Sequence, residues 1–196
     1  MRLQTVHLLD VPATPWRNGG GSTRELLAWP AAPDWQLRIS VATIDRSGPF
    51  SAYAGIERWF AVLSGDGVRL QVDQEPVVMT PASPPLCFDG AAAPQATLLG
   101  SATQDLNLML RQGAGTGGLL RANAGAGDGW TCHAAWRGLL TMGPGQLQID
   151  GQAPLPLAAA SLAWCDDAAD ARWAFAASQA HAAAAAYWLH WQPHPR

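Results

Sequence analysis

Short runs of alternating apolar and polar residues, separated by turn residues, constrain the fold of this chain more than any other feature. The clearest runs are 35–43 (WQLRISVAT), 59–63 (WFAVL), 68–72 (VRLQV) and 106–110 (LNLML). A period of two is typical of strands with one buried face, and the Gly, Pro, Asp and Ser residues between the runs favour tight turns. The pattern predicts an all-β chain, built as an antiparallel sandwich or barrel.

Two segments favour a helix instead. Alanine, the strongest helix former, dominates residues 168–186, and Ser22 or Thr23 would suit the N-cap of a short helix over residues 24–28. Both segments are candidate helices in an otherwise β-rich chain. Because alanine is enriched throughout the chain, composition bias is the alternative explanation for the first of them.

The chain matches itself at an offset of 77 residues. The offset pairs Trp59 with Trp136 and Leu63 with Leu140, and it pairs residues 70–73 (LQVD) with residues 147–150 (LQID). Two copies of one β-unit would explain the match, whereas two ordinary hairpins with glycine turns would produce part of it.

The glycine-rich stretch between the two predicted units reads as a linker. The runs 113–118 (GAGTGG) and 125–129 (GAGDG) lack the GK[ST] ending of a phosphate-binding loop and the strand and helix context of a dinucleotide site. We therefore predict an N-terminal unit over residues 1–112, a linker over 113–129 and a C-terminal unit over 130–196.

Charge and cysteine usage exclude several classes of protein. The twelve positive residues are all arginine and are scattered singly, so neither a nucleic-acid-binding stripe nor a polybasic membrane anchor is predicted. Three cysteines without a CxxC spacing indicate neither a disulfide framework nor a zinc site. His7, Asp10 and Pro12 interrupt the amino-terminal apolar residues, and no apolar run is long enough to span a bilayer. We expect a cytoplasmic protein with no nucleic-acid or membrane partner.

The motifs of metal and nucleophile chemistry are absent from the sequence. The five histidines are isolated, with no HxH or HExxH spacing, and there is no GxSxG motif. Cys132 and His133 are neighbours, but adjacent residues of a strand point to opposite faces. We expect no metal ion and no cofactor.

Candidate binding residues gather in three other segments. Residues 15–25 (PWRNGGGSTRE) contain three consecutive glycines, whose backbone entropy cost indicates a close backbone approach or positive φ angles. In residues 35–43 the side chain of Arg38 shares a face with Ser40, and in residues 104–111 (QDLNLMLR) Asp105 shares a face with Asn107. If these polar faces point inward, Arg38 and the nearby Arg58 would bind an anion. If they point outward, both are ordinary solvated side chains.

These segments resemble the HutD/Ves family, whose order and approximate spacing they follow from Pro15 to Gly113. The resemblance is looser in the C-terminal half. It implies a cupin-like β-barrel with two cupin-type units in one chain, a bicupin, which agrees with the 77-residue repeat. It also implies a bacterial protein associated with histidine utilisation that lacks the metal-binding histidines of metal-dependent cupins.

The family's motif positions fall on residues of all three segments: Trp16, Asn18, Gly19, Gly20, Gly21, Thr23, Arg38, Ser40, Ser51, Gly55, Arg58, Phe88, Gly90, Asp105, Asn107 and Met109. The chain departs from the pattern at Arg17, where lysine is common, and at Tyr53 and Leu106, where phenylalanine is common. From the motif positions we predict seven ligand-binding residues: Trp16, Asn18, Arg38, Ser40, Arg58, Asp105 and Asn107.

The resemblance leaves two functions open. In the first, the protein binds a small acidic metabolite of the formylglutamate or urocanate type without catalysis, in a regulatory or buffering role. In the second, it is a metal-independent enzyme acting on such a metabolite or on a sugar-like ligand, with Asp105 as general base. We favour binding, because acid–base catalysis usually needs a second titratable group with a different pKa. Whether the chain forms a homodimer stays open.

Overall fold

The computed structural model describes residues 2–72, 75–122, 129–167, 170–181 and 183–195, and these residues form strands and short turns of 3₁₀-helix. Within them the chain divides into two compact units, one over Val11–Gly115 and the other over Met1–Asp10 together with Thr116–Arg196. None of the helical segments described has the length and apolarity needed to cross a membrane.

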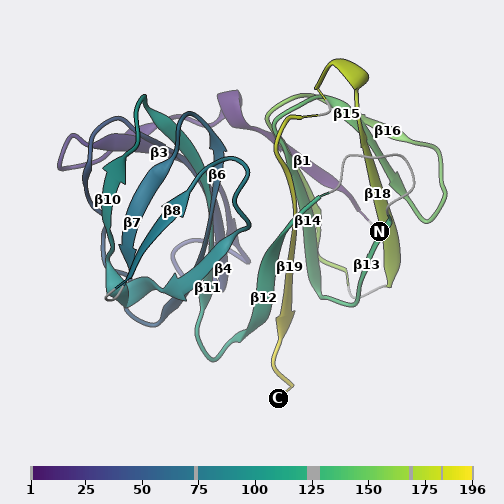
Figure 1. Ribbon diagram of the computed structural model, residues 1–196. Helices are drawn as coiled ribbons and strands as arrows, with labels where there is room; N and C mark the ends of the chain where they lie inside the picture. Colours follow the sequence, from purple (N-terminus) through teal and green to yellow (C-terminus); the bar gives the residue numbers. More distant parts are fainter. Residues whose placement is uncertain (1, 73–74, 123–128, 168–169, 182, 196) are drawn as a thin grey trace. The chain divides into compact units, whose positions relative to one another are not determined.

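The first unit packs a six-stranded antiparallel sheet on a four-stranded one (Figure 1). The larger sheet has the order β2 (Thr14–Pro15), β3 (Gly21–Trp29), β4 (Leu37–Ile44), β11 (Thr103–Arg111), β6 (Ile56–Ser64) and β9 (Leu86–Asp89). The smaller has the order β5 (Gly48–Pro49), β10 (Gln95–Leu98), β7 (Val68–Val72) and β8 (Glu75–Met79), and the 3₁₀ turn η2 spans Gly90–Ala92.

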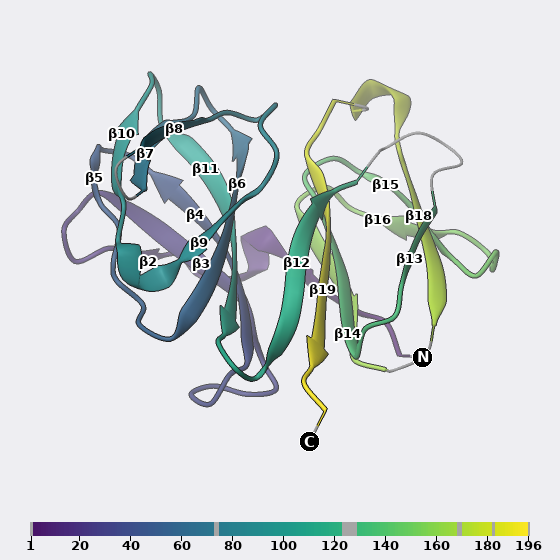
Figure 2. The same ribbon diagram turned by 60° about the horizontal axis from the view of Figure 1, so that its bottom comes forward.

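The second unit also consists of two antiparallel sheets (Figure 2). One has the order β1 (Gln4–His7), β17 (Ser161–Cys165), β14 (Trp136–Thr141), β19 (Ala186–Pro193) and β12 (Gly115–Arg121). The other has the order β13 (Gly129–Cys132), β18 (Ala171–Ala177), β15 (Gly145–Ile149) and β16 (Leu155–Leu157). The 3₁₀ turns η1 and η3 span Leu8–Asp10 and Gln179–His181.

The two units share one strand order. The run β4-β11-β6-β9 in the first unit corresponds to β12-β19-β14-β17 in the second, and β5-β10-β7-β8 corresponds to β13-β18-β15-β16. The sequence offset of 77 residues maps β6 onto β14 and β7 onto β15. The all-β prediction is confirmed. In neither unit do the described strands close into one hydrogen-bonded ring, so barrel closure is not confirmed.

Alternation along the strands sets the core of the first unit. Phe60 and Val62 point from β6 towards Val68 and Leu70 of β7, and all four are fully buried between the two sheets. Because the residues of β11 lie opposite those of β6, Asp105 (opposite Val62) and Asn107 (opposite Phe60) face the same interior.

Both helix predictions were wrong. Residues 24–28 belong to β3, and most of the described residues between 170 and 186 lie in β18, in the three-residue turn η3 or at the start of β19. Strand pairing overrides the helix propensity of alanine here, since β18 is hydrogen-bonded to both β13 and β15. Residues 168, 169 and 182 of the predicted helix lie outside the described residues.

The predicted boundaries also need correction. Residues 115–121 of the predicted linker form β12, an edge strand of the second unit, and residues 123–128 lie outside the described residues. The first ten residues belong to the second unit, because β1 pairs with β17. Long-range pairing of this kind leaves no local signal in the sequence.

Candidate functional site

A cavity of about 510 Å³ opens within the first unit, and all seven predicted binding residues line it. The complete lining is Thr14, Pro15, Trp16, Arg17, Asn18, Thr23, Glu25, Arg38, Ser40, Ala42, Pro49, Phe50, Ser51, Tyr53, Arg58, Asp105, Asn107 and Met109. The size is typical of pockets that bind small molecules.

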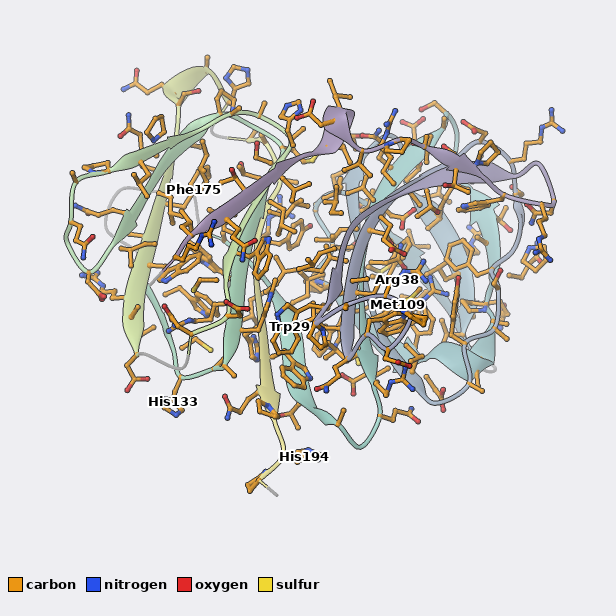
Figure 3. The ribbon with its side chains drawn as sticks, turned by 180° about the vertical axis from the view of Figure 1, so that it is seen from behind. Trp29, Arg38, Met109, His133, Phe175 and His194 are labelled. Carbon is orange, nitrogen blue, oxygen red and sulfur yellow. The ribbon has the colours of Figure 1, made fainter. Side chains whose placement is uncertain are left out.

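Strand register explains why residues far apart in sequence meet here. Met109 of β11 lies between Arg38 of β4 and Arg58 of β6, and Asn107 lies opposite Ser40. Figure 3 labels Arg38 and Met109 next to each other in the first unit. Residues directly opposite in an antiparallel pair share a face, so the polar face of β4 points inward and Arg38 is not simply solvated.

A chain of hydrogen bonds runs through the most buried part of the cavity wall. Arg58 Nη2 donates to Asn107 Oδ1 at 2.6 Å, and Asn107 Nδ2 donates to Asp105 Oδ1. The exposed fractions of Arg58, Asn107 and Asp105 are 4%, 5% and 1%. The neutral amide of Asn107 therefore joins a buried cation to a buried carboxyl group.

Some polar atoms of these hydrogen-bonded side chains have no partner. Arg58 Nε and Nη1 and Asp105 Oδ2 are buried and have no hydrogen-bond partner among the described residues. An unpaired buried polar atom costs about 1–3 kcal/mol, and more when the group is charged. The first unit tolerates this cost next to its cavity.

Burial shifts the pKa of both ionisable groups in this series of hydrogen bonds, Asp105 and Arg58. Desolvation raises the pKa of Asp105 to about 7, although the Arg58 charge and the hydrogen bond from Asn107 act in the opposite direction. Desolvation also lowers the pKa of Arg58, against the attraction of Asp105. The Asp105 carboxyl group can therefore gain or lose a proton near neutral pH.

Glu25 of β3, rather than Asp105, is the ion-pair partner of Arg38. The Arg38 Nε and Glu25 Oε2 atoms are 3.0 Å apart, and the two side chains are 17% and 47% exposed. A register shift between Glu25 and Leu27 changes the pairing of β3 with β4 at this point, which alternation alone does not predict.

Arginine and aromatic side chains alternate across this part of the first unit. The guanidinium carbons of Arg38 and Arg58 both lie 5.7 Å from the centre of the Tyr53 ring. Arg38 also lies 5.9 Å from the Trp35 ring, and Arg58 lies 5.2 Å from the Phe50 ring. Cation–π contacts stabilise the two cations side by side without neutralising either charge.

The glycine-rich segment is a hairpin turn between β2 and β3, and no helix follows it. Trp16 Nε1 donates to Thr23 Oγ1 at 2.7 Å, and Asn18 Oδ1 accepts from the Gly20 backbone at 3.0 Å. Gly19 has a φ of +67°, and a Cβ on Gly21 would collide with the Thr43 carbonyl. The glycines therefore bring Trp16 and Asn18 to the cavity rim.

Glu25 and Tyr53 also line the cavity, but neither was among the seven predicted binding residues. Glu25 lies at the end of the glycine-rich segment 15–25. Tyr53 was seen only as a departure from the family pattern. Their contact with Arg38 depends on pairing between β3 and β4 and on the loop before β6, so only a covariation signal would have predicted it.

Other polar clusters are not arranged as metal centres. Among the residues that the structure describes, no three His, Cys, Asp or Glu side chains come together in a way that would hold a metal ion. His133 is exposed, with its Nδ1 atom 2.5 Å from Asp170 Oδ1, and the neighbouring Cys132 is half-buried. Burial raises the pKa of the Cys132 thiol, which disfavours its reactive thiolate form.

The sequence pattern of the HutD family matches residues 9–185 of the chain. An uncharacterised 21.2 kDa protein from the hutC 3′ region of Pseudomonas putida is 38% identical over 110 residues. That match covers 55% of this chain and 58% of the relative, so the similarity spans little more than half the length of each protein.

Solved structures share the fold over nearly the whole chain. A conserved protein of unknown function from Pseudomonas aeruginosa, PA5104, has a TM-score of 0.85 at 27% identity, covering 98% of this chain and 100% of its own. HutD from Pseudomonas fluorescens has a TM-score of 0.81 at 22% identity, covering 99% and 100%. The cupin-like bacterial pirin YhhW from Escherichia coli has a TM-score of 0.59 at 11% identity, covering 99% and 100%.

Proposed function

Because the chain belongs to the HutD family, which is associated with histidine utilisation genes, we propose that its cavity binds a small carboxylate-bearing metabolite without converting it. Formylglutamate and urocanate are the kinds of acid that we propose. The protein would then act as a cytoplasmic sensor or buffer of such an acid, with no nucleic-acid or membrane partner.

The observation that carries this proposal is the convergence of Arg38 and Arg58 on one cavity and one aromatic ring. Two cations held close together repel each other, and the neutral Asn107 amide does not offset the charge of Arg58. Arg38 already pairs with Glu25, so a ligand carboxylate would above all supply a direct counter-charge for Arg58. Guanidinium groups offer donors arranged to match its two oxygens.

We also infer that the two units are cupin-type copies of one ancestral β-unit. Their matching strand order and the 77-residue offset support this bicupin interpretation. In this interpretation the first copy carries the proposed ligand cavity.

A ligand panel tests the proposed function. Formate, N-formylglutamate, urocanate and glutamate would each be titrated into the protein by calorimetry, with the matching neutral amides as controls. An acid that binds should raise the unfolding free energy by about 2.7 kcal/mol at one hundred times its Kd. Binding of the amides as tightly as the acids would contradict carboxylate recognition.

The alternative is a metal-independent enzyme in which Asp105 transfers a proton. The specific observation in its favour is that the pKa of this buried, cavity-lining carboxyl group is about 7, in the range that suits a general base. Asp105→Asn separates the two functions, because it removes the base while keeping the shape. Chemical conversion of a panel member by the wild-type protein, lost in Asp105→Asn, would establish catalysis instead of simple binding.

A further inference from the structure

We propose that the cavity binds its carboxylate ligand together with one proton, which Asp105 takes up from solvent, so that the occupied site contains a carboxylic acid beside a carboxylate. The inference rests on the proposed function and adds a chemical requirement to it.

The first step of the argument is the position of the Asp105 carboxyl group. Its Oδ1 atom accepts from Asn107, whereas Oδ2 is buried and has no partner among the described residues, and Asp105 is one of the residues that line the cavity. The residues opposite Asp105 on the neighbouring strands are Ala42 and Val62, which offer no side-chain donor. A carboxylate in this place is poorly solvated, while a carboxylic acid could donate from Oδ2 to a ligand oxygen.

The second step is the charge that surrounds Asp105. The other ionisable side chains lining the cavity are Arg58 on β6, Arg38 on β4, Glu25 on β3, and Arg17 and Tyr53 on loops. The four-stranded sheet contributes only Pro49, which is not ionisable. Asn107 hydrogen-bonds to both Asp105 and Arg58, and the positive charge of Arg58 separately favours the ionised form of Asp105.

The third step is what a bound anion would change. A ligand carboxylate at Arg58 would add a negative charge near Asp105. It would also offset the positive charge of Arg58, which in the empty cavity favours the ionised form of Asp105. Two carboxylates in one desolvated site cannot both ionise easily, and one of them takes up a proton. Glu25 is a weaker candidate for this proton, because it is about half exposed and lies at the rim.

The pKa of Asp105 in the empty cavity, raised by burial to about 7, is consistent with this step. Near neutral pH the empty protein would be partly protonated at Asp105, and ligand binding would complete the protonation. Above pH 7 binding should therefore weaken as the proton becomes scarcer.

Calorimetry in two buffers tests the proposal. Formate and N-formylglutamate are suitable probes, because neither has a group that titrates between pH 6 and 9. Binding heats would be measured in Tris and in HEPES, whose ionisation enthalpies differ, so that the difference reports the protons taken up. We expect uptake close to one proton per ligand at pH 8 and little at pH 6, with a Kd that rises by up to tenfold per pH unit above 7.

Two variants locate the proton. Asp105→Asn should bind the same probes with no proton uptake and a nearly constant Kd between pH 6 and 9. Glu25→Gln, which removes the other cavity-lining carboxyl group, should keep the uptake of the wild-type protein. If Asp105→Asn does not fold, loss of uptake in Glu25→Gln would still overturn the proposal.

The outcomes separate this proposal from the proposed function. Binding with no buffer-dependent heat at pH 8 would overturn proton coupling and leave carboxylate binding standing. Uptake that persists in Asp105→Asn would overturn the assignment of the proton to Asp105. If neither probe nor any other acid of the panel binds, the proposed function fails and this inference fails with it.

Discussion

The two units bury equivalent strand positions in opposite ways. Asp105 lies opposite Val62 in the first unit. The residue 77 positions after Val62 is Leu139, and Trp188 lies opposite it in the second unit, so Asp105 and Trp188 occupy equivalent positions. Trp188 stacks on Trp130 with ring centres 5.2 Å apart and contacts Trp173 at 6.3 Å. Where the first unit keeps a polar cavity, the second fills its interior with indole rings. The cavity is therefore a property of the residues and is not imposed by the strand order.

The buried arginines of the two units show the same contrast. Arg137 of β14 is fully buried and its Nη2 atom lies 2.6 Å from Asp167 Oδ1, so the second unit supplies its own counter-charge. Arg58 is buried to a similar degree but hydrogen-bonds to the neutral side chain of Asn107. A buried cation requires an anion or several acceptors, and under the proposed function the ligand carboxylate would be the direct counter-charge that Arg58 lacks.

The largest expected effect tests the aromatic interior of the second unit. Trp173 is fully buried, so Trp173→Ala should lower the unfolding free energy by about 3–5 kcal/mol in a denaturant titration. The affinity of the first unit for a carboxylate should not change. As a control, Leu155→Ala at an exposed position should shift stability by less than about 0.5 kcal/mol. A loss of affinity equal to that of an arginine variant would show that the two interiors are not independent.

The next prediction compares the pH dependence of stability. The pKa of Asp105 is raised by burial to about 7, so the folded state holds this proton more tightly than the unfolded chain. The unfolding free energy should therefore decrease as the pH rises from about 4 to 7, by up to about 1.4 kcal/mol per pH unit and on the order of 4 kcal/mol in all. Asp105→Asn should remove this loss, as measured by denaturant titrations across the range.

His190 in the second unit should show the opposite trend. His190 lies opposite Arg137, which is 77 residues after Phe60, so its position is equivalent to that of Asn107 in the first unit. Burial lowers the pKa of His190. The folded state therefore favours the neutral ring, and stability should be lost as the pH falls below about 6.5. His190→Gln should reduce the loss on the acid side only. If both variants changed the slope of the pH profile in the same direction, the contrast between the two interiors would not hold.

The sequence predicted the strands and the polar face that lines the cavity better than it predicted which strands and side chains pair. Alternation in 35–43 and 104–111 placed Arg38 with Ser40 and Asp105 with Asn107 on shared faces, and β4 and β11 confirm this arrangement. The alternation could not reveal whether that face was interior. The packing of Phe60 and Val62 against β7 decides this, and it depends on contacts between distant strands.

Failures of the sequence analysis have the same cause. The alanines of residues 171–177 have a high helix propensity, but pairing with β13 and β15 makes this segment a strand. Glu25 reaches Arg38 across a register shift that no local pattern reports. Local chemistry therefore predicted residues that line the cavity, whereas the identity of their partners required the three-dimensional pairing.

A smaller effect is expected when one arginine of the cavity is changed. A charge-assisted hydrogen bond to a carboxylate contributes about 1.5–3 kcal/mol, so Arg38→Ala should weaken carboxylate binding by roughly ten- to a hundredfold. Arg38→Lys should restore only part of the affinity, because an ammonium lacks the guanidinium fork. Arg69→Ala, on the exposed face of β7, is the matched control and should bind like the wild-type protein. Equal affinities in all three variants would remove Arg38 from the site.

The smallest effect concerns the Arg38–Glu25 ion pair at the cavity rim, which is more exposed than the Arg137–Asp167 pair of the second unit. Glu25 is about half exposed, and exposed pairs contribute about 0.2–1 kcal/mol. A ligand carboxylate at Arg38 must compete with Glu25, so Glu25→Gln should strengthen carboxylate binding by up to about fivefold at low salt. Salt screens exposed charges, and the gain should disappear in calorimetric titrations near 1 M salt. A weaker affinity in Glu25→Gln would instead mean that Glu25 contacts the ligand, as it would for a ligand that carries an ammonium group.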